Sequence, residues 1–305
     1  MAKKKGIPLN GWLCLDKPYG ISSNNALQIV KRILNPQKIG HSGTLDPLAS
    51  GILPIALGEA TKTVAYAMDN EKTYVFTITF GEERSTGDAE GEVIATSKVI
   101  PNKDDVASVL AGFTGKITQT PPKFSALKIN GKRAYDLARN NEDFELPQRE
   151  VLIKSLEIIA STEENSNQIT LKTTCGKGTY VRSLAMDIAE KLGSKGYVSY
   201  LRRTKVGFFC EKNAILLDKI ETLGHIASVE EFLLPVETAL TDISALALSD
   251  EEALDLKKGK AVVCKAANFE NLTQNEIAYA LNQDKLVAIV RKNDNFVVPI
   301  RVMNY

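Results

Sequence analysis

The sequence has little cysteine and little histidine, and this scarcity argues against several kinds of site. Its four cysteines stand singly and form no CxxC pair, so neither a disulfide framework nor a zinc site is predicted. The two histidines, His41 and His225, are far apart in the chain, which argues against a multi-histidine metal centre. We therefore expect chemistry that needs no metal.

Long apolar runs are also absent. The N-terminal MAKKKGIPLNGW has three lysines and no apolar stretch long enough for a signal peptide, and no run of about 20 apolar residues follows it. We therefore expect a soluble, cytoplasmic protein with no membrane partner. A net charge of +1 offers little general attraction for nucleic acid, so such a partner would have to be held by local patches.

The length and composition suit a globular chain of two domains. With 305 residues, 44% of them apolar and 25% charged, the chain can bury a sizeable core. A domain boundary is expected near 235–245, where LLPVETALTDIS contains a proline and several small residues.

Local patterns predict several elements of the first domain. A strand at 12–15 ends at the turn KPYG, and Ser22 or Ser23 caps a helix with one apolar stripe. Residues 73–80 alternate as a strand with one buried face does. Asp104 is expected to cap a short helix, and Asn130-Gly131 predicts a hairpin. A strand at 169–174 leads through a glycine loop into a helix that contains Arg182.

The tail carries its own signals. Ser249 and Glu252 form the pattern of a capping box, and Gly259 ends the helix that follows. Strands are expected at 261–264, 277–281, 286–290 and 296–303.

The segment from 38 to 63 reads as a glycine- and proline-rich loop of the kind that carries function. Asp46 lies within it, in GTLDP. The common interpretation of Asp-Pro is a turn in which the aspartate bonds its own backbone. Here, however, the aspartate has apolar neighbours, among which an ionised carboxylate is costly unless a cation holds it.

Arg182 is a candidate for that cation, because a guanidinium can grip a carboxylate with two parallel hydrogen bonds. The alternative is an ordinary solvated arginine at a helix start. The glycine-rich segments GKGT and GEATKT do not fit the phosphate-binding pattern GxxxxGK[ST], so no nucleotide cofactor is expected.

Two further side chains have open alternatives. Tyr74 is either a core aromatic or, being at the start of its strand, a ring that lies under a planar ligand. His41 is either a loop histidine bonded to a neighbouring carbonyl or a flat ring that fills the gap left by an unstacked base.

Two stretches are locally basic and contain aromatics, which favours an RNA partner. Residues 123–139 hold five basic side chains against one acidic, and residues 177–205 hold seven against two, including Arg202-Arg203 beside Tyr200. Such stretches suit phosphate contact combined with base stacking, although a charge run is more often simply a solvated face.

Five segments together resemble the TruB-type tRNA pseudouridine-55 synthase family. They are LDKPYGISSN, HSGTLDPLASGILP, KTYVFTITFG, PPKFSALKINGKRAYDLAR, and CGKGTYVRSL followed by YLRRTKVG. These segments span most of residues 10–208 in the order found in that family.

The resemblance implies an α+β fold with two domains. The first, residues 1–238, is a mixed-sheet pseudouridine synthase catalytic domain with a thumb inserted at about 121–150. The second, residues 239–305, is a small, β-rich, PUA-like RNA-binding domain.

The resemblance also implies roles for single residues. Asp46 would be the catalytic aspartate, Arg182 its partner, and Tyr74 the ring that stacks on the target base. Residues that bind or support the substrate site would be His41, in the vacated stack, Tyr180 and Leu201, lining the uridine pocket, and Lys17, supporting the active-site loop together with Pro18.

The reaction so implied breaks an N-glycosidic bond, turns the uracil and reattaches it through carbon, without redox change and therefore without a cofactor. The uridine, at position 55 in the T-loop of tRNA, would first be flipped out of its stack. The expected partner is the T-arm stem-loop of tRNA, and the chain is expected to act as a monomer. Attack by Asp46 on the base, attack on the sugar, and proton removal at the ribose all stay open.

Two other functions compete with this one. A tRNA-binding chaperone without catalysis could use the same cleft and thumb to remodel folded RNA. A guide-RNA-dependent synthase within a ribonucleoprotein particle would share the catalytic motifs, although the thumb-like segment favours a stand-alone enzyme.

Overall fold

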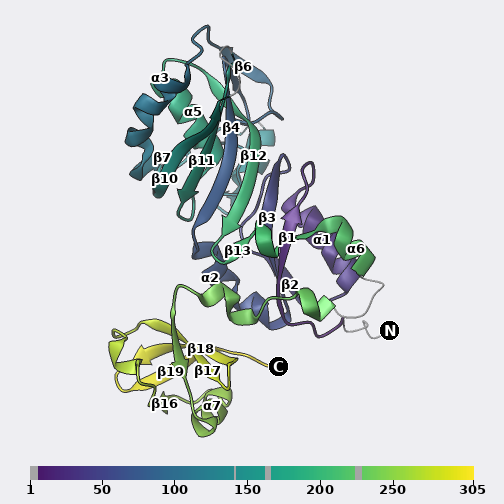
Figure 1. The fold of residues 1–305 in the computed structure, drawn as a ribbon, viewed down its shortest axis with the longest axis vertical. Helices are drawn as coiled ribbons and strands as arrows, with labels where there is room; N and C mark the ends of the chain where they lie inside the picture. The colour runs from purple at the N-terminus through teal and green to yellow at the C-terminus, as the bar shows by residue number, and fades with distance from the viewer. Residues whose placement is uncertain (1–5, 141, 162–165, 224–228) are drawn as a thin grey trace.

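A mixed ten-stranded sheet organises the first three quarters of the chain (Figure 1). The computed structural model describes residues 6–140, 142–161, 166–223 and 229–305, so the N-terminal lysines and His225 lie outside the described residues. The sheet runs in the order β14 (Ile215–Leu216), β1 (Gly11–Lys17), β3 (Ala49–Leu57), β12 (Gly196–Val206), β4 (Lys72–Phe80), β11 (Gln168–Cys175), β10 (Arg149–Ser161) and β7 (Gly115–Gln119), with β2 (Ile39–His41) beside β3 and β13 (Phe209–Cys210) beside β12.

Helices pack on this sheet at both ends and connect its strands. They are α1 (Ser23–Leu34), α2 (Val64–Asp69), α3 (Lys103–Val109), α4 (Ala134–Arg139), α5 (Val181–Lys191) and α6 (Leu217–Leu223), with 3-10 turns η1 (Gly58–Thr63), η2 (Leu110–Phe113), η3 (Glu211–Asn213), η4 (Val229–Phe232) and η5 (Val236–Leu240). Two small hairpins complete the region: β5 (Glu82–Arg84) with β6 (Val93–Thr96), and β8 (Lys128–Ile129) with β9 (Lys132–Arg133). None of the helices in the described residues is long and apolar enough to cross a membrane.

The tail forms a separate five-stranded sheet, seen at the lower left of Figure 1. Its order is β15 (Ser244–Ala247), β17 (Ile277–Asn282), β18 (Lys285–Asn293), β19 (Phe296–Val302) and β16 (Val262–Val263), with α7 (Asp250–Lys257) and η6 (Phe269–Asn271) packed alongside. The predicted capping box is present, since Ser249 Oγ accepts from Glu252 N and Ser249 N donates to the Glu252 carboxylate. Gly259 follows the helix with a φ of +82°.

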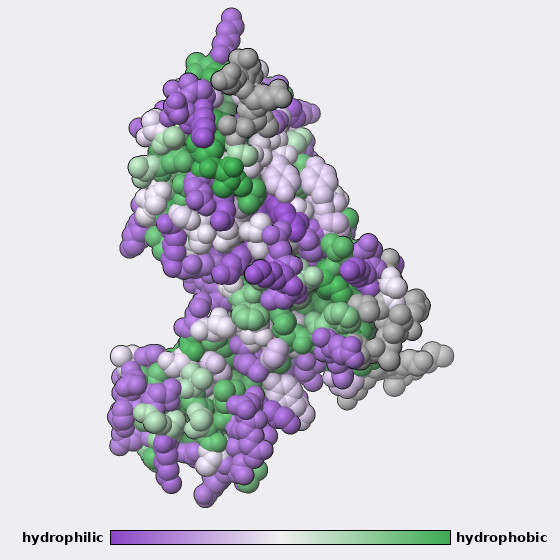
Figure 2. Space-filling model, viewed as in Figure 1, coloured by the Kyte–Doolittle hydropathy of each residue, from purple (hydrophilic) through white to green (hydrophobic). Residues whose placement is uncertain are grey.

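The α+β class with a mixed sheet and a β-rich C-terminal part is therefore confirmed. On the face drawn in Figure 2, hydrophilic side chains surround smaller apolar areas, and the outline is indented between the C-terminal lobe and the rest. The boundary at residue 238 stays a prediction, because η5 extends across it.

Alternation along β1 divides its side chains between two cores. Leu13 and Leu15 pack under α1, whereas Trp12 and Cys14 face the other side, toward η5 and the tail residue Met303. Trp12 is fully buried, and its indole N–H donates to the carbonyl of Val236 over 3.1 Å. This second core joins the C-terminal part to the main sheet.

Two of the predicted elements need correction. Residues 38–63 are mostly regular structure, namely β2, β3 and η1, because the apolar run after Ala49 enters the sheet. Only about 42–48 remain as a loop. The short helix α3 is capped by Asn102, whose side-chain oxygen accepts from the N–H groups of Asp104 and Asp105, and not by Asp104.

The strand β4 also differs from its prediction, because both of its faces are buried. It lies centrally between β12 and β11, so its threonines are covered as well as its aromatics. Their hydroxyls are paired across the sheet, Thr73 with Thr174 at 3.1 Å and Thr77 with Thr170 at 2.8 Å. Threonine satisfies its own hydroxyl in this way, which makes a buried strand look half-polar in the sequence.

Candidate active site

The loop that carries Asp46 is short and held at several points. It connects β2 to β3, and Leu45 is fixed by Ser23, whose hydroxyl donates to the Leu45 carbonyl over 2.9 Å and accepts from its N–H over 2.7 Å. Ser23 is the first residue of α1, so the helix start anchors the loop. The position of Asp46 is thus set by backbone contacts on the residue beside it.

Lys17 anchors the same loop from the end of β1. Its side chain is fully buried, and Nζ donates to the carbonyls of Pro18 (2.9 Å), Ile21 (2.7 Å) and Pro47 (3.5 Å). Burial lowers the pKa of the Lys17 ammonium to about 8, although the negative charge of nearby Asp46 raises it in part. Its contacts are those of a residue that supports the loop; a direct contact with substrate remains a prediction.

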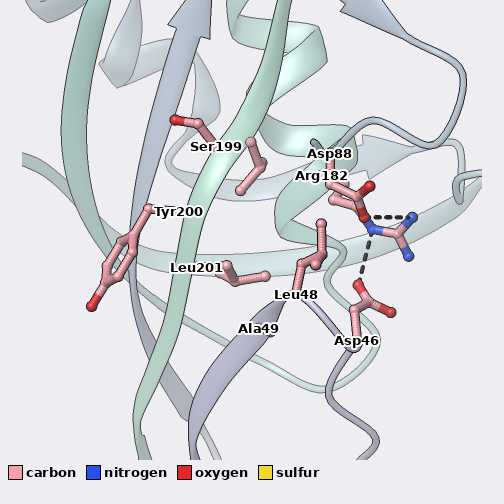
Figure 3. A pocket seen from close by; sticks show the side chains of 9 residues that line it. Asp46, Leu48, Ala49, Asp88, Arg182, Ser199, Tyr200 and Leu201 are labelled. Atoms are coloured by element: carbon pink, nitrogen blue, oxygen red, sulfur yellow. Dashed lines mark ion pairs between the residues drawn. The ribbon is translucent and has the colours of Figure 1, made fainter. Parts of the chain in front are cut away.

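Arg182 meets Asp46 at the beginning of α5 (Figure 3). Its Nε lies 3.0 Å from Oδ2 of Asp46, and the arginine side chain is 5% exposed whereas the aspartate is 38% exposed. The predicted ion pair is therefore present in the structure. The carboxylate remains open on the side away from the guanidinium.

The expected two-bond grip is wrong in geometry, because the other guanidinium nitrogens are occupied elsewhere. Nη1 donates to the carbonyl of Thr86 over 2.7 Å, and Nη2 donates to the carbonyl of Phe124 over 3.0 Å. Nη1 also lies 3.6 Å from the carboxylate of Asp88. Arg182 thus bridges three segments of chain and gives Asp46 one nitrogen.

Asp88 is a residue that the sequence reasoning missed. Figure 3 shows it on the other side of the Arg182 guanidinium from Asp46. Its Oδ1 accepts from the Thr86 hydroxyl over 2.6 Å and from the N–H of Glu90 over 3.1 Å. An aspartate in a turn-rich segment carries no local signal of such a role; only the fold brings it beside α5.

The environment of Asp46 shifts its protonation in a definite direction. Burial at the floor of the site raises the pKa of the Asp46 carboxyl. The positive charge of Arg182 acts against burial, and the negative charge of Asp88 adds to it. The carboxylate is therefore more basic than an exposed aspartate.

Tyr74 and Arg203 form a second pair, on neighbouring strands of the sheet. They are direct partners in the β4–β12 register. Burial raises the pKa of Tyr74, and the Arg203 charge opposes this. Arg203 is 1% exposed, and it donates to the carbonyl of Ile52 over 2.8 Å and to that of Gly43 over 2.9 Å. Arg203 therefore holds both sides of the Asp46 loop and stands beside Tyr74 in the sheet.

Several cations of the basic stretch 177–205 have partners within the protein, and contact of this stretch with RNA stays a prediction. Arg203 is bonded to backbone carbonyls, and Arg202 is neutralised by Asp16 (2.7 Å) and Glu211 (2.7 Å). Lys177 pairs with Asp69 at 2.9 Å. The count over 177–205 missed these acidic partners because Asp16, Asp69 and Glu211 all lie outside that stretch.

A cavity of about 690 Å³ brings most of the predicted site residues together. Those that line it are Asp46, Tyr74, Tyr180, Arg182 and Leu201. Its charged lining side chains are six basic against three acidic, namely Lys72, Arg133, Arg149, Lys177, Arg182 and Arg203 against Asp46, Asp69 and Glu150. Such a balance favours a polyanionic ligand.

Tyr180 and Leu201 reach this cavity from different elements. Tyr180 precedes α5, and the Gln119 side chain accepts from its N–H and donates to its carbonyl, each over 3.1 Å. Leu201 lies on β12 beside Ala49 of β3, close to the end of the Asp46 loop.

His41 lies at the end of β2, partly buried, and does not line the cavity. Burial, and then the charge of Arg203, lower the pKa of the His41 imidazole. Within the described residues its Nδ1 has no hydrogen-bond partner, so no carbonyl contact at that atom is seen. A stacking role for His41 remains a prediction.

Two family models together match residues 31–241, which include nearly all strands of the main sheet. A model of the N-terminal domain of TruB family pseudouridylate synthases matches residues 31–181, and a model of the C-terminal domain of tRNA pseudouridylate synthase B matches residues 182–241.

Individual relatives match over almost the full length. The chain is 48% identical over 305 residues to tRNA pseudouridine synthase B of Caulobacter vibrioides, covering 98% of each chain. It is 44% identical over 306 residues to the protein of the same name from Rhodospirillum rubrum, covering 99% of each.

Solved structures share the fold. A chain of a Cbf5-Nop10-Gar1 complex superposes with a TM-score of 0.72 at 26% identity, covering 96% of this chain and 84% of that one. An H/ACA RNP bound to a substrate RNA containing 2'-deoxyuridine gives a TM-score of 0.74 at 23% identity, covering 100% and 92%. At 23% identity, the second match shows only that the fold is shared.

Proposed function

Because the chain belongs to the TruB family of pseudouridine synthases and is therefore an isomerase, we propose that it converts uridine 55 in the T-loop of tRNA to pseudouridine. In this proposal Asp46 is the nucleophile and Tyr74 stacks on the target base. The chain is 44–48% identical, over nearly its full length, to relatives named for tRNA, and this supports tRNA as the substrate.

One observation carries the assignment of Asp46. Its carboxylate lies 3.0 Å from Arg182 Nε in a cavity that Tyr74 also lines. Arg182 has its remaining nitrogens committed to Thr86, Phe124 and Asp88, so it is a fixed cation and not a mobile side chain. A fixed cation favours the ionised carboxylate, which is the nucleophilic form.

The reaction conserves all atoms of the nucleotide except for one exchanged proton. The bond from ribose C1' to uracil N1 breaks, the uracil turns, and a bond from C1' to C5 forms. The C5 proton leaves to a base, and N1 gains a proton. Asp46 acts as nucleophile on the base or the sugar, or as the base at the ribose, and all three routes use its open, ionised oxygen.

A target base in a folded loop must leave its stack to reach the floor of a cavity. Flipping costs a few kcal/mol of stacking and pairing energy, and contact with aromatic and apolar walls restores part of it. Tyr74 and Leu201 supply such walls here. The basic balance of the cavity offers the phosphodiester backbone a favourable potential.

Tritium release tests this function directly. Unmodified tRNA carrying tritium at uridine C5 would be incubated with the purified chain, because isomerisation at C5 releases that label. We expect stoichiometric release from the wild-type chain, with pseudouridine at position 55 in the product, and none from Asp46→Asn. Absence of release from the wild-type chain would overturn the proposal.

The same experiment separates the competing functions. A chaperone without catalysis would bind and remodel the tRNA but release no tritium. A guide-dependent enzyme would be inactive alone on a T-arm stem-loop and active only with added guide RNA. Greater identity to the tRNA-named relatives than to the matched chain of the Cbf5-Nop10-Gar1 complex supports the stand-alone enzyme.

A further inference from the structure

Arg149 is a cation in the candidate cavity that has no anionic partner among the described residues. It begins β10, and its guanidinium lies over the ring of Tyr180, with the central carbon 4.4 Å from the ring centroid. In the described part of the chain, Nε and Nη2 are both buried and neither has a hydrogen-bond partner. No carboxylate among the described residues pairs with this guanidinium.

Such a group is unusual because an unpaired buried donor carries its full desolvation cost. The neighbouring acidic residue, Glu150, does not relieve it, since its carboxylate pairs with Lys116 at 3.1 Å. An incoming ligand with acceptor oxygens would therefore meet donors that need not first give up another partner.

Arg84 provides the comparison within the same protein. Its guanidinium also lies over a tyrosine ring, 4.6 Å from the centroid of Tyr197, and its Nε is also unpaired. Its terminal nitrogens, however, bind the Glu82 carboxylate over 3.0 Å and the Gly91 carbonyl over 3.2 Å. Arg84 does not line the candidate cavity. The aromatic contact alone is therefore structural; what distinguishes Arg149 is its unpaired edge at the cavity.

We propose that Arg149 binds an RNA backbone phosphate adjacent to the target nucleotide, with its unpaired edge as the donor and the Tyr180 ring holding the guanidinium plane. This inference rests on the function proposed above and deepens it. The ring covers one face of the guanidinium, so oxygens must approach in its plane, which is the geometry of arginine–phosphate pairs.

The cavity lining offers a second unpaired group. Ser125 lines the same cavity, and its hydroxyl is buried without a partner in the described residues. Ala126, Leu127 and Arg133 of the same segment also line it. Because the Nε–Nη2 edge is buried, a phosphate can reach it only after neighbouring groups move aside.

A binding experiment with neutral linkages tests the proposal. A T-arm stem-loop RNA would be made with one methylphosphonate at a time at the phosphates around the target uridine. Affinities would be measured for the Asp46→Asn chain, so that turnover does not interfere, and for the same chain carrying Arg149→Gln or, as matched control, Arg84→Gln.

We expect Arg149→Gln to weaken binding of the unmodified RNA by about fivefold to tenfold. The slope of log affinity against log salt should fall by about 0.7–0.9, the value of one phosphate contact. At one linkage, the methylphosphonate should weaken binding to the parent chain by a similar factor. The same substitution should not weaken binding to the Arg149→Gln chain any further. Arg84→Gln should keep the parent affinity and slope.

Unchanged affinity and salt slope in Arg149→Gln, or losses that add to those of every methylphosphonate, would overturn the proposal. Such additivity would mean that Arg149 contacts a base or only supports Tyr180. If Arg149→Gln fails to fold, Arg149→Lys decides the question: it keeps the charge and should keep the salt slope while losing part of the sensitivity at the same linkage. An Arg149→Lys chain that is as sensitive as the parent to the methylphosphonate at that linkage would contradict the assignment.

The outcome is independent of catalysis. Failure of the wild-type chain to release tritium would defeat the proposed isomerisation, whereas the linkage-specific coupling is measured by binding alone.

Discussion

Arg182 Nε lies 3.0 Å from Asp46 Oδ2, while Nη1 of the same guanidinium lies 3.6 Å from Asp88. One cation is thus shared by two carboxylates, and two backbone carbonyls hold it in place. The arrangement gives Asp46 a fixed neighbour on one side and leaves its other side open to the cavity.

Replacing Asp46 by asparagine should remove turnover and leave RNA binding nearly unchanged. The amide fills the same space but cannot act as a nucleophile, so we expect the single-turnover rate to fall more than about 1,000-fold. Affinity should change by less than about threefold, because phosphate contacts supply most of it. Pseudouridine formation and filter binding measure the two quantities.

Asp69→Asn is the matched control for this change. Asp69 lines the same cavity, but it is exposed and pairs with Lys177. It should keep wild-type turnover. An equal loss of binding and turnover in Asp46→Asn would instead identify Asp46 as structural.

Arg182→Lys should lower the rate although the charge is kept. An ammonium cannot reach Asp46, the Thr86 carbonyl and the Phe124 carbonyl together, so the cation loses its fixed position. We expect a loss of about 100-fold in the single-turnover rate, comparable to removal of one preorganised donor. Arg84→Lys, outside the cavity, should change the rate little. Near-normal turnover in Arg182→Lys would contradict the importance of this pair.

The sequence anticipated the parts of this site that depend on local pattern. Asp46 has a distinctive setting in GTLDP, and Arg182 follows a glycine loop at a helix start. Asp88 and Arg203 could not be identified in this way, because their roles depend on contacts with α5 and with the Asp46 loop that form only in the folded chain. Arg203 was counted only as part of a basic stretch suited to phosphate contact, because the sequence does not distinguish an arginine bonded to buried carbonyls from a solvated one.

The same limit applies to the fold. Capping at Ser22, the Asn130-Gly131 hairpin and the capping box at Ser249 follow from neighbouring residues and were predicted correctly. The strand β3 was read as loop because its glycine and proline suggested turns, while its burial between β1 and β12 is a property of the sheet.

As the pH is lowered, the rate should begin to fall, on the acid limb of its pH profile, at a higher pH than it would for a reaction that depends on an exposed aspartate. The reaction needs ionised Asp46, and burial raises the pKa of this carboxyl. Activity is therefore retained above the raised pKa and lost as pH falls through it. Single-turnover rates measured across the acid range give the half-point.

Asp88→Asn supplies a directional check on this limb. The Asp88 charge raises the pKa of Asp46, so its removal should move the half-point to lower pH, whatever the height of the plateau. Asp187→Asn is a control, because Asp187 also has a raised pKa, of about 6, but lies outside the cavity lining. If Asp187→Asn moves the half-point and Asp88→Asn does not, the acid limb does not report the ionisation of Asp46.

Gly51→Ala should destabilise the fold far more than Gly20→Ala, although both glycines have positive φ. Gly51 lies on β3 directly after the Asp46 loop, with φ +101°, and an added Cβ would come 2.2 Å from the carbonyl oxygen of Arg203. Gly20 has φ +90° and nothing within 4 Å of an added Cβ. The pair therefore separates backbone strain from steric clash.

For Gly20→Ala only the strained backbone contributes, about 1–2 kcal/mol. For Gly51→Ala the clash forces β3 away from β12 at the row that holds Arg203 beside Tyr74, so we expect a loss above about 3 kcal/mol. Thermal melting of the two variants should differ by several degrees or more. Equal melting temperatures would show that β3 and β12 can separate at Gly51 without cost, and the tight coupling of Arg203 to the Asp46 loop would then be untenable.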